Sequence, residues 1–242
     1  MALNARLKAF AEKVLPRRVV AWLDPVQYLI ESEIQQASEW IREGQVVLDA
    51  GAGEARHRKY FKKGRYLALD NAYGDTAWNY SGLDVRGDLE NIPLRSASVD
   101  CILCMVVLEH TRRPQQVLLE FARVLKPGGT LAMIVPFLWE EHQAPQDFFR
   151  FTRYGMQSLF ESTPFRLDVL NPMGGFFRVC ARRSIAFLTF FQGGVRWIPF
   201  VLLAPFFGLI FPLLLNFMDG MDKVQNYSLG FRIRARRMPE ST

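Results

Sequence analysis

The sequence is poor in the residues that cross-link small secreted proteins. Among 242 residues there are three cysteines, which are too few for a disulfide framework, so we expect a reducing compartment. Cys101 and Cys104 form a C-x-x-C without a second pair, on a segment with the composition of a strand. Because residues three apart on a strand face opposite sides, packing explains this pair better than a metal or redox site does.

The sequence contains no internal repeats or low-complexity segments, and we expect no secretory leader. Its first twenty residues, MALNARLKAFAEKVLPRRVV, contain no uninterrupted apolar core, which argues against a secretory signal peptide. Half of the residues are apolar and 22% are charged, a composition typical of a folded protein. The length suits one large α/β domain with additions.

Positive charge is unevenly distributed along the chain. The formal net charge of +6 arises from residues 150–242, which carry 12 basic and 5 acidic residues, whereas residues 1–149 carry 18 and 19. This asymmetry predicts an anionic partner, either nucleic acid or an anionic membrane surface.

Short apolar strands alternate with helical segments through the middle of the chain. Strands are predicted at 45–49, 65–70, 100–108 and 130–137, and helices at 54–63 and 114–129. Apolar, non-alternating strands separated by helices indicate a parallel sheet covered on both faces. We therefore predict a domain over residues 45–242, preceded by an N-terminal helical cap over residues 1–44.

The loop after the first strand, 46-VVLDAGAGEA-55, is rich in glycine. It does not match the phosphate-binding pattern G-x-x-x-x-G-K-[ST], and Arg56 replaces the third glycine of a dinucleotide fingerprint. Asp49 would repel a pyrophosphate, and Asp70 ends the next strand at the same crevice. A ligand with cationic groups near Asp49 and ribose hydroxyls near Asp70 fits better, and S-adenosylmethionine has both.

Four blocks in order make the chain resemble class I S-adenosylmethionine-dependent methyltransferases of the type 11 group. The blocks are VLDAGAG (47–53), YLALD (66–70), DLENIPLRSASVDCILCMVVLEH (88–110) and FARVLKPGGTLAMIVP (121–136). The resemblance implies a Rossmann-like α/β fold whose seven-stranded, mostly parallel sheet has an antiparallel last strand. It departs from the family at Ala55, where many members have a third glycine, but alanine is small enough for cofactor binding to survive.

The resemblance also implies roles for individual residues. Gly51 and Gly53 would let the backbone approach the methionine part of S-adenosylmethionine, and Asp49 would lie near the amino group through water. Asp70 would take both ribose hydroxyls. The residues implied near the adenine or beneath the sulfonium are Asn71, Asp88, Leu89, Cys104 and Met105. No metal is implied.

A polar and aromatic segment, 139-WEEHQAPQDFFRFTRYGMQSLFE-161, follows the strand that ends near Pro136. It resembles the H-x-x-P-x-D-x-x-R-x-T segment of some bacterial type 11 members, and its loop should open over the cofactor crevice. Thr152 is predicted to cap the helix that follows. A structural role is also open, in which Asp147 and Arg150 simply pair to brace the loop.

Two histidines are candidate catalytic residues. His142 is a candidate base for an acceptor hydroxyl, because a histidine near its ordinary pKa suits that task. His110 follows the fourth strand, near the methyl-transfer site by family resemblance, and its alternative role is to fix its own loop. His57 lies among charged residues on a predicted helix and is expected to be solvated.

Residues 184–218 form an apolar insert before the last predicted strand, 226–237. Residues 197–218 are uncharged and, as a helix, would reach about 33 Å, enough to span a hydrocarbon core. A single crossing would separate the last strand from its sheet, so we expect a re-entrant or in-plane hairpin that enters and leaves from one face. The flanking arginines and Trp197 suit an anionic interface. Burial of the insert as a lid or dimer interface is the alternative.

The predicted function is S-adenosylmethionine-dependent methyl transfer to a small or lipid-linked acceptor, such as a polyprenyl-linked glycan or a quinone precursor. We expect a cytoplasmic protein that is peripheral or re-entrant at the inner membrane face. One alternative is a methyltransferase for a soluble small molecule, and another is a non-catalytic S-adenosylmethionine-binding protein. Nucleic acid is disfavoured as a partner because no separate RNA-binding module is visible. The acceptor, the methylated atom and the oligomeric state stay open.

Overall fold

The computed structural model describes residues 16, 20, 25–74, 77–191 and 193–239. The chain divides into two compact units. One, here called the sheet domain, contains Ile30–Asn171 and Gly230–Thr242, and the other contains Met1–Leu29 and Pro172–Leu229. Within the predicted N-terminal cap, the structure shows helix α3 at Pro25–Trp40, and most of residues 1–24 lie outside the described residues.

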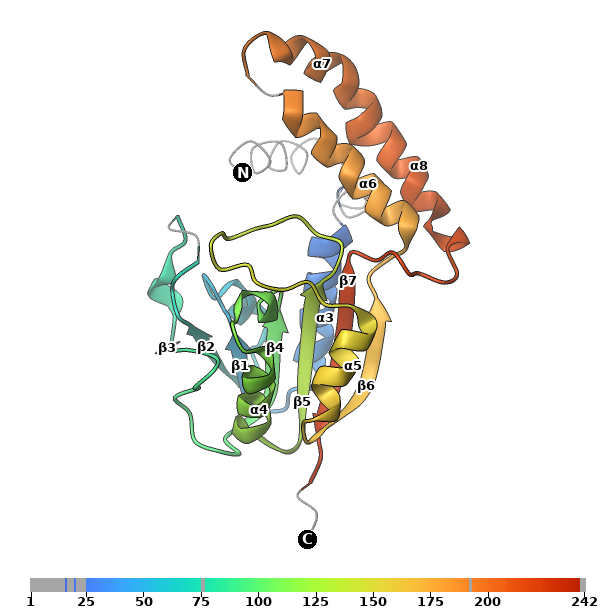
Figure 1. The fold of residues 1–242 in the computed structure, drawn as a ribbon. Coiled ribbons are helices and arrows are strands. Elements are labelled where there is room, and N and C mark those ends of the chain that lie inside the picture. The colour runs from blue at the N-terminus through green and yellow to red at the C-terminus, as the bar shows by residue number, and fades with distance from the viewer. Residues whose placement is uncertain (1–15, 17–19, 21–24, 75–76, 192, 240–242) are drawn as a thin grey trace. The chain divides into compact units, whose positions relative to one another are not determined.

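The sheet domain is built on seven strands in the order β3-β2-β1-β4-β5-β7-β6 (Figure 1). Pairing is parallel from β3 to β5 and antiparallel between β5 and β7, which confirms the predicted fold class. The strands are β1 Val46–Ala50, β2 Arg65–Asp70, β3 Val85–Arg86, β4 Val99–Met105, β5 Leu125–Pro136, β6 Phe165–Pro172 and β7 Gly230–Arg237.

The central strands are buried because their residues are apolar on both faces. Leu48 on β1, Ile102 on β4 and Leu131 on β5 are fully buried, and Phe121 fills the core from α4. The order of strands reverses between β1 and β4, so the carboxyl ends of these two strands form the topological switch point where ligands bind in such sheets.

Helices cover both faces of the sheet (Figure 1). Helix α4, Pro114–Val124, and helix α5, Arg153–Glu161, lie on one face, and α3 lies on the other. Thr152 caps α5 as predicted, because its hydroxyl accepts the N–H of Gly155 at 3.0 Å.

Two helix predictions were wrong in extent or type. The segment 54–63 forms only a 3-10 helix at Arg56–Tyr60, because Ala55 just before it adopts the left-handed conformation, with φ 54°. The helix predicted to run to residue 129 stops at Val124, where the chain turns into β5 at Leu125.

The arginines near the C-terminal end of the chain form hydrogen bonds and ion pairs within the sheet domain. Arg232 and Arg234 on β7 face α3, where both donate to the buried carboxylate of Glu33 at 2.8 and 3.0 Å. Arg236 approaches Asp168 at 3.7 Å, and Arg237 donates to the carbonyl of Leu125. Arg232, Arg234 and Arg237 therefore stabilise the sheet domain, whereas the side chain of Arg236 is 54% exposed.

The second unit contains a helical hairpin, defined here as residues 173–228. Its first arm is α6, Phe176–Phe187, and its second arm is α7, Trp197–Pro205, followed by a π-helical turn at Phe206–Ile210 and by α8, Phe211–Met218. Figure 1 shows α6 and α8 side by side. The π turn lies between two prolines, Pro205 and Pro212, which cannot donate to an α-helical ladder.

Polar bonds close the hairpin at one end. The N–H of Met173 donates to the hydroxyl of Ser228 at 2.9 Å, and the N–H groups of Gly175 and Arg178 donate to the carboxylate of Asp219 at 3.0 Å each. The chain therefore leaves and rejoins the hairpin at the same end. One helical run in the described residues, Trp197–Met221, is long and apolar enough to cross a membrane by length and composition alone.

Candidate functional site

The glycine loop lies at the carboxyl end of β1 and is shaped by close packing. Gly51 has φ +82°, and a Cβ there would lie 2.4 Å from a methyl group of Val107. The N–H of Gly51 donates to the carbonyl of Leu69 at 2.9 Å, which ties the loop to the end of β2. Gly53 has φ +52° and lies against the ring of Trp78. A side chain at Gly51 would displace its neighbours, so the loop can offer bare backbone to a ligand.

Asp70 closes the loop from β2. One oxygen of its carboxylate accepts the N–H of Gly53 at 2.9 Å, and the other accepts the N–H of Ala72 at 2.7 Å. Each carboxylate oxygen has a second lone pair, so the group can still accept two hydroxyls. The position and free acceptor capacity of Asp70 fit a ribose, as the resemblance implies.

Asp49 is buried and already has two protein partners. Its Oδ2 bonds Nδ1 of His57 at 2.8 Å and also accepts the hydroxyl of Tyr66. Burial and the Asp49 carboxylate raise the pKa of the Tyr66 phenol well above its ordinary value. The expectation that His57 is solvated was wrong, because its ring turns inward to this carboxylate.

The other residues implied for the cofactor differ in exposure. Asn71 and Asp88 are exposed, and their side chains accept the backbone N–H groups of Tyr73 at 3.0 Å and Glu90 at 2.9 Å. Leu89 and Met105 are buried, and Cys104 is fully buried in the core. Burial also raises the pKa of the Cys104 thiol well above its ordinary value, so this side chain acts as packing.

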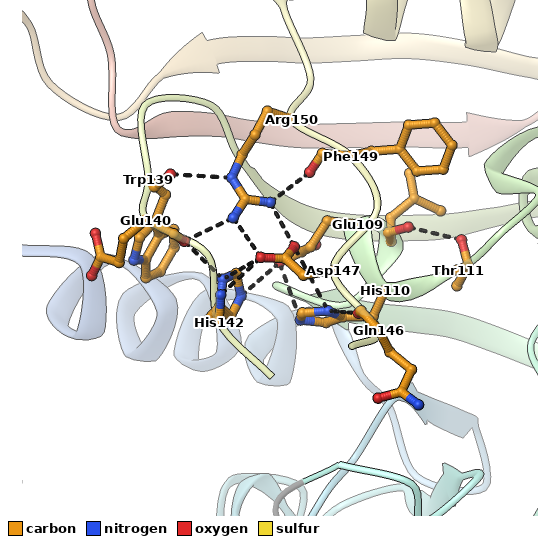
Figure 2. Close-up of polar contacts among 11 residues, drawn as sticks. Glu109, His110, Thr111, Trp139, Glu140, His142, Gln146, Asp147, Phe149 and Arg150 are labelled. Atoms are coloured by element: carbon orange, nitrogen blue, oxygen red, sulfur yellow. Dashed lines mark hydrogen bonds and ion pairs between the residues drawn. The ribbon is translucent and has the colours of Figure 1, made fainter. Parts of the chain in front are cut away.

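The polar segment after β5 folds into a braced loop (Figure 2). Arg150 makes two bonds of 2.6 Å to the carboxylate of Asp147, so the pairing suggested by the sequence is present. Arg150 also donates to the carbonyls of Trp139 at 3.2 Å and Glu140 at 2.7 Å. Burial raises the pKa of Asp147, but the Arg150 guanidinium and the backbone N–H of His142 outweigh this effect and lower the pKa to about 2.

The braced loop is attached to the chain that follows β4. The N–H of Phe148 donates to the carbonyl of Glu109 at 2.9 Å, and Nδ1 of His110 lies 2.5 Å from the carbonyl oxygen of Gln146. These contacts bring His142 from the loop to His110, with ring centroids 4.7 Å apart. The two histidines predicted as catalytic are therefore neighbours.

A third residue completes this group. Glu109 is fully buried, and its Oε1 lies 3.4 Å from Nε2 of His142 and 3.7 Å from Nε2 of His110 (Figure 2). Burial disfavours the charged form of His142, yet the facing Glu109 carboxylate outweighs it and raises the pKa of the imidazole. Glu109, His110 and His142 are called the histidine–glutamate cluster below.

Sequence reasoning overlooked Glu109 and the partners of Asp49. Glu109 lies in VLEH, directly after a buried strand, where an acidic residue is a signal in itself. The sequence around Tyr66 did not indicate a contact with Asp49, because its hydroxyl reaches Asp49 only when β1 and β2 pair in parallel. Trp78, against Gly53, also lies outside the motif blocks.

Comparison with known proteins places the motif blocks in one family. Residues 48–133 match the type 11 methyltransferase family, described as a methyltransferase domain. A probable S-adenosylmethionine-dependent methyltransferase of Mycolicibacterium smegmatis is 34% identical over 99 residues, which cover 38% of each protein. The chain spans less than half the length of the curated relatives that it matches.

Solved structures share the fold at low sequence identity. A methyltransferase of Burkholderia thailandensis, solved with 1,6-didemethyltoxoflavin and S-adenosylhomocysteine, has a TM-score of 0.50 at 17% identity and covers 98% of this chain and 90% of its own. The [4+2]-cyclase SpnF has a TM-score of 0.53 at 16% identity, covering 86% and 82%. Because a cyclase shares this fold, function has to be argued from the site and not from the architecture.

Proposed function

Because residues 48–133 are a class I methyltransferase domain with S-adenosylmethionine as its cofactor, we propose that this chain transfers a methyl group to a small or lipid-linked acceptor at a membrane surface. The observation that carries the proposal is the convergence of the glycine loop, Asp70 and the histidine–glutamate cluster at the carboxyl ends of neighbouring strands. When bound, S-adenosylmethionine supplies an electrophilic methyl group on a sulfonium.

The cofactor side of the site consists of backbone and carboxylates. Gly51 and Gly53 admit the methionine part because their backbone is free of side chains, and Asp70 accepts the ribose hydroxyls. Asp49 attracts the amino group through water. The residues proposed near the adenine and the sulfonium are Asn71, Asp88, Leu89 and Met105, and Cys104 supports this end of β4 from the core.

On the acceptor side, His142 and His110 are the candidate catalytic residues. Catalysis rests mainly on holding the acceptor atom in line with the methyl group, for which the loop braced by Asp147 and Arg150 is suited. For a hydroxyl acceptor, His142 is the proposed base, and Glu109 strengthens it by raising its pKa. Replacement of His142 by alanine should then lower turnover at a saturating acceptor concentration, and unchanged turnover would exclude it as the base.

The membrane part of the proposal rests on the hairpin. A stripe of large apolar side chains along its second arm is exposed, namely Ile198, Val201, Leu202, Phe206, Ile210, Leu214 and Phe217. Apart from the adjacent pair Val201 and Leu202, these residues recur every three or four positions, the spacing of a helical face. An exposed apolar face of this length is typical of a surface that contacts lipid or another protein. Lipid contact would bring a lipid-linked acceptor within reach of the enzyme.

The test is methyl transfer from radiolabelled S-adenosylmethionine into a cell extract that contains membranes, followed by organic–aqueous partition. We expect the label in the organic phase with the wild-type chain and not with Asp70→Ala. Label in the aqueous small-molecule fraction would instead favour a soluble acceptor. A chain that binds S-adenosylmethionine but labels no fraction would favour the non-catalytic alternative.

A further inference from the structure

The histidine–glutamate cluster contains buried polar atoms that lack hydrogen bonds. Both carboxylate oxygens of Glu109 and the Nε2 atoms of His110 and His142 are buried without a hydrogen-bond partner. One donor atom from each residue lies within 4.8 Å of the others. Leaving a buried polar atom unsatisfied costs about 1–3 kcal/mol, and more for a charged group, so four such atoms at one point require an explanation.

The hydrogen bonds of the two rings fix which nitrogen carries the proton. Nδ1 of His110 lies 2.5 Å from the carbonyl oxygen of Gln146, and Nδ1 of His142 lies 3.2 Å from the carbonyl oxygen of Glu140. A carbonyl only accepts, so each Nδ1 must donate. In neutral imidazoles both Nε2 atoms then bear lone pairs. Two nitrogen lone pairs and a carboxylate therefore face one another with no hydrogen between them.

The surrounding charges leave this group short of a cation. The nearby acidic residue, Asp147, is neutralised by the two bonds from Arg150. In the described part of the chain, the ion-pair contacts of Glu109 are with the two imidazoles. A fully buried carboxylate is strongly disfavoured unless a cation faces it. Protonation of His142, which Glu109 favours, would supply one charge, whereas a bound metal ion would supply charge and also satisfy the Nε2 atoms of both rings.

We propose that Glu109, His110 and His142 bind one divalent transition-metal ion. Two imidazoles and one carboxylate form a donor set typical of zinc and iron(II), whereas magnesium and calcium prefer oxygen donors. The two separations from Glu109, 3.4 and 3.7 Å, are close to the spacing of ligands placed about 2.1 Å from a tetrahedral centre, and all three donor atoms lie within 4.8 Å of one another. Three protein ligands leave a position open for water or for another oxygen ligand.

The second layer of contacts is that of a metal site. Ligating histidines usually donate their other ring N–H to a carbonyl or carboxylate, which orients the ring. The carbonyls of Gln146 and Glu140 fill this role. Asp147 accepts the backbone N–H of His142 at 2.8 Å and lies 3.4 Å from its Nδ1, so the bracing of the loop also positions a ligand.

This inference changes the chemistry of the acceptor side and, in that respect, rests on the proposed function. A bound ion would occupy the Nε2 lone pair of His142, so that residue would be a ligand and not the base. The open position would hold an acceptor oxygen and favour its deprotonated form. Methyl transfer would then depend on the metal, although metal binding itself requires no acceptor and no S-adenosylmethionine.

The test uses the full chain without a histidine tag, stripped with a chelator and titrated with Co²⁺, whose visible spectrum reports ligand number and geometry. We expect one equivalent bound with a low-coordinate spectrum, displaced by Zn²⁺ and not by Mg²⁺. Glu109→Gln and His142→Ala should weaken binding at least about 100-fold, and Asp147→Asn about 10- to 100-fold. The matched control is His57→Gln, because the sequence has only three histidines and His57 lies outside the cluster.

Absence of a stoichiometric Co²⁺ spectrum in the wild-type chain would overturn the proposal, as would equal binding by wild type, Glu109→Gln and His142→Ala. Thermal unfolding of each variant separates a lost ligand from a lost fold, and the wild-type titration stands even if Glu109→Gln does not fold. Calorimetry with S-adenosylmethionine on the same samples separates the two hypotheses. Metal binding without cofactor binding would support the metal site and exclude the methyltransferase proposal. Cofactor binding without metal binding would support the methyltransferase proposal and exclude the metal site.

Discussion

The sheet domain and the helical hairpin differ in how many of their large apolar side chains are exposed. Of the twenty large hydrophobic side chains exposed in the described residues, fourteen lie between Phe176 and Tyr227, and only five belong to the sheet domain. The central strands of the sheet are almost wholly buried. The sheet domain therefore buries most of its apolar side chains within itself, whereas the hairpin has an exposed apolar face, a feature typical of surfaces that contact lipid or protein.

Polar groups differ between the two regions as well. In the sheet domain, buried carboxylates such as Asp49 and Glu109 gather at the carboxyl ends of the strands, where a ligand is expected. In the hairpin, the buried carboxylate Asp219 and the hydroxyl of Ser228 bind backbone at the closed end. Buried carboxylates therefore mark the candidate site and also pair with arginines in the sheet domain, as Glu33 does, whereas Asp219 holds the closed end of the hairpin.

The largest expected effect tests whether the two regions act independently. Asp70→Ala should weaken S-adenosylmethionine binding about 1,000-fold, because two hydrogen bonds to a charged group, each worth about 1.5–3 kcal/mol, are lost. The N–H groups of Gly53 and Ala72 also lose their acceptor. Calorimetry measures the loss, and vesicle binding by the same variant should equal that of the wild-type chain. Normal cofactor affinity in Asp70→Ala would show that the site is misplaced.

The sheet was predictable because its signals are local. Runs such as QVVLD and DCILCMVVL are apolar on both faces, which indicates a buried parallel strand, and Thr152 precedes a helix that needs a cap. The helix at 54–63 failed because the left-handed backbone at Ala55 depends on tertiary packing and not on helix propensity.

The site was predictable only in part, since its members come from different elements. The sequence motif located Asp70 and the glycines, and the polar segment located His142. Nothing in the spacing shows that His142 meets Glu109, because the 32 positions between them include the whole of α4 and β5. The inward turn of His57 toward Asp49 likewise needs the irregular turn after the glycine loop.

The next effect concerns the apolar face of the hairpin. The triple variant Ile198→Ser, Leu202→Ser and Phe206→Ser should weaken binding to vesicles of anionic lipid about 100-fold, which is about 2.8 kcal/mol, because an in-plane helix buries each side chain only in part and full burial would contribute about 1.5–3 kcal/mol each. The matched control is Leu119→Ser with Tyr154→Ser, which replaces exposed apolar residues of the sheet domain. Co-sedimentation with vesicles measures both. Unchanged vesicle binding, combined with a change from dimer to monomer, would make the face a protein interface.

The smallest expected effect is the difference in stability between two glycine-to-alanine variants, one in each region. Gly51 in the sheet domain and Gly193 in the hairpin both have positive φ, +82° and +95°, but a Cβ at Gly51 would lie 2.4 Å from Val107, whereas nothing lies within 4 Å of one at Gly193. Gly193→Ala should therefore cost about 1–2 kcal/mol of stability from backbone strain alone. Gly51→Ala should cost about 1–3 kcal/mol more, from overpacking.

Urea unfolding of the two alanine variants checks this difference, and a second substitution separates its causes. In a Val107→Ala background the two closest contacts at residue 51, with the methyl groups of Val107 at 2.4 and 2.5 Å, are removed and the Cβ contact at 3.0 Å is kept, so the added cost of Gly51→Ala should fall toward that of Gly193→Ala. If it does not fall, the cost at Gly51 arises from the backbone of the loop and not from Val107. In that case the loop would be held by its φ angle and its bond to Leu69, and the close approach of Val107 would contribute little to its shape.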